Sequence, residues 1–253
     1  MIPKIIHYCW FGNKPLPALA IKCIDSWRKF LPDYEIKEWN EENFDINIIR
    51  YTKEAYEAKK YAFVSDYARY WILYHHGGLY FDTDVEIIKP LNDIINRGSF
   101  MGCENYDITG KCFSQKLGIN PGLGMGSTPQ HPFFLEMLNL YSTEYFINDN
   151  GTLNLKNIVN RTTEAIEKYG LVFVNEKQNI ANIWIYPKEY FNPRNLSGKL
   201  VLTPNTCSIH HFAASWLSPK VKLKEHLKIV LAKIIGENVY KYLRKIKRMI
   251  NFS

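Results

Sequence analysis

The chain has 253 residues, of which 46% are hydrophobic and 15% aromatic, so it can bury the core of one domain of ordinary size. Its net charge of +7 is concentrated at one end: residues 219–253 hold ten Lys or Arg against two Glu, and the other 218 residues hold 22 basic against 23 acidic side chains. This distribution argues against a nucleic-acid-binding domain, which is expected to carry positive charge on its folded body, and the absence of a run of about 18 apolar residues argues against a membrane-spanning helix.

Apolar strands alternate with helices in the first part of the chain. Residues 2–8 and 34–39 are predicted to be strands, and residues 16–30 a helix that ends before a proline. A long helix is predicted over residues 52–76, closed by a glycine pair, and a strand over residues 79–88. This alternation predicts an α/β fold with a mostly parallel central sheet, whose ligands bind beyond the carboxyl ends of the strands.

Asp66 and Arg69 are three residues apart in the predicted long helix and therefore share one of its faces. Charged side chains on a mostly apolar helix cost free energy unless they are paired or used in binding. The pair is either a structural ion pair or part of a binding site.

Asp82 and Asp84 follow at the end of an apolar run. On a strand, side chains two residues apart point to the same side, so the two carboxylates are expected to converge. Carboxylate oxygens suit Mg²⁺ or Mn²⁺, and such ions are commonly held by one or two carboxylates together with substrate phosphates. The alternative is a turn at the end of a strand with two solvated carboxylates.

The segment that contains these four residues resembles the sugar-binding region of glycosyltransferase family 32 and the catalytic domain of the large clostridial glucosylating toxins. The shared residues are Ser65-Asp66, Arg69-Tyr70, Tyr74, Gly77-Gly78, Tyr80, Asp82 and Asp84. The resemblance implies a GT-A-type fold that binds a nucleotide-sugar. Asp82 and Asp84 would hold Mn²⁺ or Mg²⁺ on the donor diphosphate, Asp66 and Arg69 would orient sugar hydroxyls, and Tyr80 would contact the donor.

The resemblance also implies roles for two residues near predicted loops. Trp10, after the first strand, would stack on the donor base, although a core tryptophan is the alternative. Asn120, in a glycine-rich segment, would face the donor sugar. For that segment, a sharply turned loop before a helix at residues 132–141 is an equally good interpretation.

Near residue 210 the resemblance implies a histidine that completes the metal site, with Ser215 and Trp216 on the diphosphate. His210 and His211 are adjacent, and adjacent residues of a strand face opposite ways, so only one can point at the ion. The family pattern of two apolar residues before the histidine favours His210, and His211 stays open. Two ordinary surface histidines are the alternative.

Residues 219–253 are predicted to form a basic amphipathic helical tail, separate from a catalytic domain at residues 1–218. Its apolar residues recur at spacings of three and four: Leu227, Val230, Leu231, Ile234, Ile235, Tyr242, Leu243, Ile246, Met249 and Ile250. Such a helix can lie on an anionic membrane surface. The same apolar stripe could pack on the body or on a second subunit instead, and both interpretations stay open.

The function implied is that of a metal-dependent, retaining glycosyltransferase. It would move a sugar from a nucleotide-diphosphate sugar, expected to be a UDP-sugar, to a saccharide acceptor in capsular polysaccharide or lipopolysaccharide synthesis. Five scattered cysteines without Cys-x-x-Cys spacing favour reduced thiols in a cytoplasm, so we expect a cytoplasmic enzyme, free or peripheral on the inner face of the cell membrane. The alternatives are a nucleotide-sugar hydrolase or phosphotransferase, and a membrane-associated scaffold with a degenerate site.

Overall fold

The computed structural model describes residues 1–106, 116–194 and 199–213, together with residues 227, 230 and 234. Ser215, Trp216 and almost all of the predicted tail lie outside the described residues. Within the described part, no helix has both the length and the apolar character that crossing a membrane would require.

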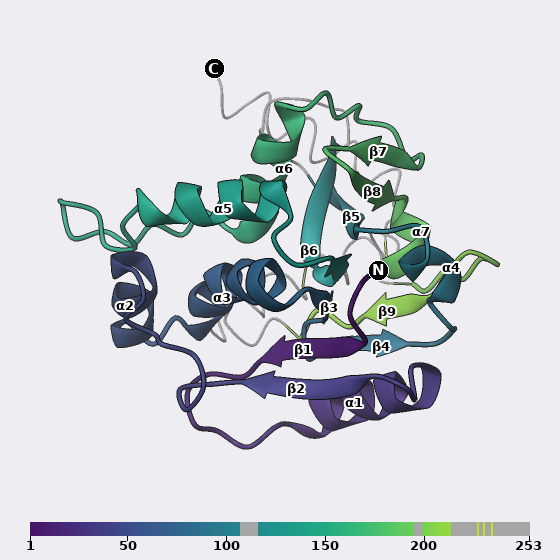
Figure 1. Cartoon of the computed structure of the whole chain (residues 1–253), viewed down its shortest axis with the longest axis horizontal. Helices are drawn as coiled ribbons and strands as arrows, with labels where there is room; N and C mark the ends of the chain where they lie inside the picture. Colours follow the sequence, from purple (N-terminus) through teal and green to yellow (C-terminus); the bar gives the residue numbers. More distant parts are fainter. Residues whose placement is uncertain (107–115, 195–198, 214–226, 228–229, 231–233, 235–253) are drawn as a thin grey trace.

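A seven-stranded sheet forms the centre of the fold, in the order β2-β1-β3-β6-β5-β8-β7 (Figure 1). Its strands are β1 (Ile5–Cys9), β2 (Glu35–Trp39), β3 (Gly78–Tyr80), β5 (Phe100–Tyr106), β6 (Lys116–Ser127), β7 (Gln178–Ile180) and β8 (Ile183–Tyr186). The predicted α/β class is confirmed. Three of the pairings between these described strands are parallel and three antiparallel, so the sheet is mixed rather than mostly parallel. One reason is that β5 and β6 are consecutive neighbours joined by a short connection, which antiparallel strands allow and parallel strands do not.

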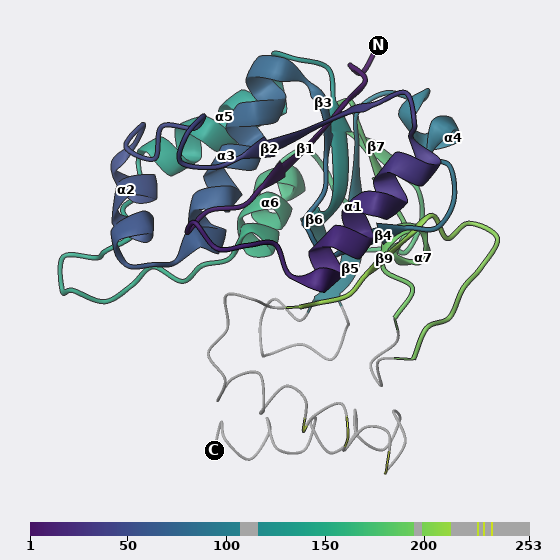
Figure 2. The same cartoon turned by 90° about the horizontal axis from the view of Figure 1, so that it is seen from below.

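Helices cover both faces of this sheet. They are α1 (Ala18–Phe30), α2 (Arg50–Glu57), α3 (Tyr61–His76), α4 (Asn92–Ile95), α5 (Pro132–Ser142), α6 (Ile158–Glu167) and α7 (Lys188–Phe191). Helix α1 lies on one side and α3, α5 and α6 on the other (Figure 2). Because neighbouring residues of a strand point to opposite faces, Phe100 joins the core beneath α1 and α7, and Met101 joins the core beneath α2, α3, α5 and α6.

The strand predicted over residues 79–88 is two strands. Strand β3 ends at Tyr80 in the central sheet, and β4 (Val85–Ile87) pairs with β9 (Ser208–His210) in a separate antiparallel ribbon. The turn between them is closed by a hydrogen bond from the backbone N–H of Val85 to the carbonyl of Asp82 at 3.0 Å. The indole N–H of Trp27 in α1 donates to the carbonyl of Val85 at 2.7 Å, which fixes the ribbon against the body.

Two further predictions need correction. The helix predicted over residues 52–76 is broken into α2 and α3 at Lys59, whose φ of 57° is incompatible with a continuous helix. Its predicted end at Gly77 is confirmed. The segment around Asn120, for which a sharp loop was one interpretation, belongs to the long strand β6. Two of its glycines lie against aromatic rings, since a Cβ on Gly124 would lie 2.9 Å from Phe81 and one on Gly126 would lie 2.4 Å from Phe100.

Candidate functional site

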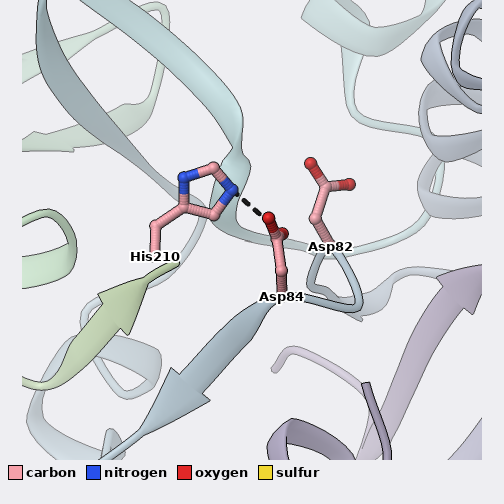
Figure 3. Close-up of side chains that lie close together, drawn as sticks. All are labelled: Asp82, Asp84 and His210. Atoms are coloured by element: carbon pink, nitrogen blue, oxygen red, sulfur yellow. Dashed lines mark ion pairs between the residues drawn. The ribbon is translucent and has the colours of Figure 1, made fainter. Parts of the chain in front are cut away.

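Two carboxylates and an imidazole converge at the turn between β3 and β4. Asp82 and Asp84 lie on this turn, and His210 is the last residue of β9, opposite Val85 in the ribbon. Ligand atoms of the three side chains all lie within 4.8 Å of one another (Figure 3). Asp82 and Asp84 converge as predicted, although they do so from a turn rather than from one strand.

Asp84 is held by hydrogen bonds and by an ion pair. Its Oδ1 lies 3.0 Å from Nε2 of His210, and its Oδ2 accepts a hydrogen bond from the backbone N–H of Ala213 at 2.8 Å. Burial disfavours the charged forms, but the attraction between the two groups, together with the N–H of Ala213 at Asp84 and the nearby carboxylates at His210, outweighs it. The pKa of Asp84 therefore lies below its usual value and the pKa of His210 above it. Asp84 is therefore an anion at neutral pH.

Asp82 is the more exposed carboxylate, with 30% of its side chain accessible against 15% for Asp84. Its Oδ1 lies 3.2 Å from Nη1 of Arg69, and its backbone N–H donates to the carbonyl of Gly122 at 3.3 Å. Burial raises the pKa of Asp82, and the charge of Arg69 opposes that shift only in part.

Arg69 joins the turn to helix α3. Its side chain is only 4% exposed, and Nη2 lies 3.2 Å from Oδ1 of Asp66 while Nη1 faces Asp82. The guanidinium carbon lies 4.7 Å from the centre of the Tyr80 ring, a cation–π contact that compensates part of its desolvation. The structural and the binding interpretation of Asp66 and Arg69 are therefore compatible, since the buried pair ends at the metal-binding candidate Asp82.

The buried Asp66 predicts a pH dependence of stability. Burial raises its pKa to about 7, with the charge of Arg69 opposing the shift, whereas an unfolded aspartate titrates near pH ~4. Between these values the folded state binds more protons, so stability decreases as pH rises. We expect the free energy of unfolding of the metal-free protein to fall, relative to that of Asp66→Asn, as pH rises from about 4 to about 8 in urea titrations. Parallel pH profiles of the two proteins would contradict this assignment.

Two other predicted donor residues, Trp10 and Asn120, lie after β1 and within β6. Trp10 directly follows β1, packs partly on the core beneath α1, and donates from its indole N–H to the carbonyl of Lys14 at 2.5 Å. Asn120 on β6 is 7% exposed and donates to the carboxylate of Glu104 at 2.8 Å. Stacking of Trp10 on a base and contact of Asn120 with a sugar stay predictions.

The two histidines face different partners. His210 lies against Asp84, whereas Nε2 of His211 lies 2.8 Å from the carboxylate of Glu86, which also pairs with Lys22. His211 is thus not part of the carboxylate–imidazole group in this structure, and its candidacy as a metal ligand is not supported. His210 is the last residue of β9 and His211 the first residue after it, where the backbone N–H of His211 donates to the carbonyl of Asp84 at 2.9 Å.

Sequence reasoning missed Glu104. This carboxylate lies on β5, and burial raises its pKa above the usual value. The signal was a single acidic residue at the end of the apolar run Phe100-Met-Gly-Cys103. Only the pairing of β5 with β6, which sets Glu104 opposite Gly118 and Cys103 opposite Ile119, brings it to Asn120.

Asp82, Asp84 and His210 fit a divalent cation by their chemistry. Carboxylate and imidazole ligands suit Mn²⁺, and carboxylates with added waters suit Mg²⁺. The 3.0 Å between Asp84 Oδ1 and His210 Nε2 matches the ~3 Å expected between two ligand atoms at right angles around an ion with bonds of about 2.1 Å. In addition, Nδ1 of His210 is buried without a hydrogen-bond partner among the described residues, so the orientation of the ring depends on Nε2.

Comparison with known proteins gives a consistent result. Residues 17–101 match the family model of the glycosyltransferase sugar-binding region containing the DXD motif. The chain is 27% identical over 252 residues, 95% of its own length and 90% of the relative, to the uncharacterized glycosyltransferase L373 of Acanthamoeba polyphaga mimivirus. It is 27% identical to inositol phosphoceramide mannosyltransferase 1 of Schizosaccharomyces pombe, over 57% of this chain and 45% of that protein. It is also 30% identical to mannosyl phosphorylinositol ceramide synthase CSH1 of Saccharomyces cerevisiae, over 54% of this chain and 35% of that protein. The chain thus spans less than half the length of these two fungal relatives.

Two solved structures show a weaker likeness to this chain. PaToxG glycosyltransferase has a TM-score of 0.48 and 20% identity, covering 66% of this chain and 69% of that one. Galactosyltransferase LgtC, solved with donor and acceptor sugar analogues, has a TM-score of 0.43 and 12% identity, covering 88% of this chain and 95% of that one.

Proposed function

We propose that this chain, a glycosyltransferase with a DXD sugar-binding region at residues 17–101, transfers a hexose from a nucleotide-diphosphate sugar to a saccharide hydroxyl. The convergence of Asp82, Asp84 and His210 is the observation that carries this proposal. Asp82 and Asp84 are the two aspartates of the DXD motif. A Mn²⁺ or Mg²⁺ ion held by the three side chains would neutralise the charge that develops on the diphosphate leaving group.

The other residues of the site would bind and orient the donor. Asp66 and Arg69 reach the site from α3 and would position sugar hydroxyls, with Tyr80 beneath the guanidinium. Since Arg69 is 3.2 Å from both Asp66 and Asp82, a sugar bound to it would be held in a fixed relation to the metal ligands. Trp10 would stack on the base, and Ser215 and Trp216 would contact the diphosphate from outside the described residues. Retention at the anomeric carbon is proposed on the resemblance to family 32.

The fungal relatives suggest the donor sugar. Both are named as mannosyl-transferring proteins, which makes mannose the first candidate for the hexose here. Their named acceptors are lipids that carry an inositol phosphate. A lipid-linked saccharide is therefore our preferred acceptor, and surface polysaccharide synthesis the preferred pathway.

The tail at residues 219–253 would bring the enzyme to such an acceptor. Its charge of +8, from ten Lys or Arg and two Glu, would attract an anionic leaflet, to which each basic side chain adds about 1 kcal/mol. Packing of its apolar stripe on the body or on a second subunit is the competing proposal.

A donor panel tests the proposed function. We expect one nucleotide-sugar among UDP-glucose, UDP-galactose, UDP-N-acetylglucosamine and GDP-mannose to raise the melting temperature only when Mn²⁺ or Mg²⁺ is present, because a ligand that binds the folded state stabilises it by mass action. The same donor should yield a glycosylated product when saccharide or glycolipid acceptors are supplied. The Asp84→Asn variant serves as the matched control and should show no metal-dependent shift.

The outcomes separate the alternatives. Release of free sugar at the same rate with and without every acceptor would favour a nucleotide-sugar hydrolase. Transfer of a sugar phosphate rather than of the sugar would favour a phosphotransferase. If no nucleotide-sugar stabilises the protein with either ion, the result would favour a membrane-associated scaffold with a degenerate site.

A further inference from the structure

Glu104, which belongs to none of the roles proposed above, is connected to the metal-binding turn. Its Oε2 accepts a hydrogen bond from Nδ2 of Asn120 at 2.8 Å. Oδ1 of Asn120 in turn accepts from the backbone N–H of Gly122 at 2.8 Å. Both ends of the Asn120 amide are thereby engaged, so the amide cannot turn over without losing both hydrogen bonds, and its orientation depends on the carboxylate of Glu104.

Gly122, whose N–H is bound to Asn120, contacts Asp82 directly. Its carbonyl accepts a hydrogen bond from the backbone N–H of Asp82 at 3.3 Å. A Cβ on Gly122 would lie only 2.2 Å from Oδ2 of Asp82 and 3.0 Å from Oδ1 of Asn120. The carboxylate of Asp82 therefore lies directly against the backbone of Gly122 on one side, while its other oxygen faces Arg69 at 3.2 Å.

We propose that Glu104 is a positioning residue for the metal ligand Asp82, acting through Asn120 and Gly122. Arg69, on α3, contacts Oδ1 of Asp82. Gly122, held by Asn120 and Glu104 on β6 and β5, lies against Oδ2 and restricts its movement. This clamp holds the DXD carboxylate in place before any ion binds. The role of Asp82 as a metal ligand rests on the proposed function, whereas the clamp on its position does not.

Two substitutions of Glu104 distinguish positioning from mere packing. Glu104→Gln keeps an oxygen that can accept from Asn120, and Glu104→Leu removes it. By calorimetry without donor, we expect Glu104→Leu to weaken Mn²⁺ binding by about 10–100-fold, the usual effect of losing a residue that orients a metal ligand. Glu104→Gln should retain affinity within about threefold of the wild type, because the hydrogen bond to Asn120 is preserved.

Glu54→Leu is the matched control. This buried carboxylate on α2 accepts hydrogen bonds from the backbone N–H groups of Phe146 and Ile147 at 3.0 and 2.9 Å. Helix α2 lies on the far side of α3 from the ribbon of β4 and β9 (Figure 1). It should lower the free energy of unfolding without changing Mn²⁺ affinity. Equal Mn²⁺ affinity of Glu104→Leu and the wild type would overturn the proposal.

A second measurement does not depend on the metal. In the metal-free protein, amide hydrogen exchange at Gly122 and Asp82 should be faster in Glu104→Leu than in the wild type, and unchanged in Glu104→Gln. If the wild type binds no Mn²⁺ but this pattern is found, the metal assignment fails and the clamp stands; unchanged exchange in Glu104→Leu overturns the clamp. Should Glu104→Leu not fold, Asn120→Leu replaces it, because it removes the same hydrogen bond from the other side, and wild-type Mn²⁺ affinity in that variant would equally count against the proposal.

Discussion

Replacement of Asp84 by Asn is expected to lower the rate of sugar transfer by two to three orders of magnitude, about 3–4 kcal/mol of transition-state stabilisation. Asn has the shape of Asp and can still accept the hydrogen bond from the N–H of Ala213, which is 2.8 Å away in the wild type. It removes the negative charge that attracts His210 at 3.0 Å and that would balance a bound divalent ion. The larger loss should therefore fall on metal-dependent chemistry, and urea unfolding measures the separate cost of losing the ion pair with His210.

Initial rates at saturating Mn²⁺, together with urea unfolding, measure this effect. Asp25→Asn is a matched control, because Asp25 is an exposed aspartate paired with Arg28 on α1 and should keep the wild-type rate. Wild-type transfer by Asp84→Asn in excess EDTA would rule out Asp84 as a metal ligand.

Replacement of Arg69 by Met should have the largest effect on stability. The side chain is 4% exposed, and its removal leaves the buried Asp66 and the partly buried Asp82 without their cation. Breaking a buried ion pair from one side commonly costs about 3–5 kcal/mol, because the remaining charge is uncompensated. The pKa values of both carboxyl groups should rise further, since Arg69 is the main charge that opposes the effect of burial on each of them.

The destabilisation by Arg69→Met should therefore depend on pH. It is expected to be smaller at about pH 5, where the two carboxyl groups can bind protons, than at about pH 8, where they must carry charge or take up protons at a cost. Arg28→Met removes an exposed partner of Asp25, with both side chains 62% accessible, and should change the urea midpoint little at either pH. Equal urea midpoints for Arg69→Met and Arg28→Met would show that the Asp66–Arg69–Asp82 contacts do not stabilise the packing of α3 on the turn between β3 and β4.

Local sequence patterns predicted some parts of this molecule well. Helix α1, strands β1 and β2, and the stop of α3 at Gly77 follow from periodicity, Pro32 and the glycine pair, which act within a few residues. The long Ser65–Asp84 pattern identified Asp66, Arg69, Asp82 and Asp84, and the structure brings these four together. The split between β3 and β4 was not predictable from local pattern, because it results from pairing of β4 with β9 near the other end of the chain.

Pairing between distant strands explains the remaining differences. Whether His210 or His211 faces Asp84 is decided by the register of β9 against β4, in which His210 is opposite Val85. The contact of Glu104 with Asn120 depends on the register of β5 against β6, which shifts between Met101 and Gly102. Neither register can be read from one strand alone, and a shift of one residue would reverse the direction of each side chain.

The ribbon of β4 and β9 limits how the chain can be divided or recombined. A fragment that ends after α5 would contain the whole sugar-binding region of residues 17–101 and both aspartates of the motif, but it would lack the strand that carries His210. Excised alone, or grafted into a chimaeric transferase, that region would leave the edge of β4 without its partner and Asp84 without the N–H of Ala213. The smallest portable unit for protein engineering therefore extends at least to residue 213, and boundaries drawn from motif similarity alone would cut through the site.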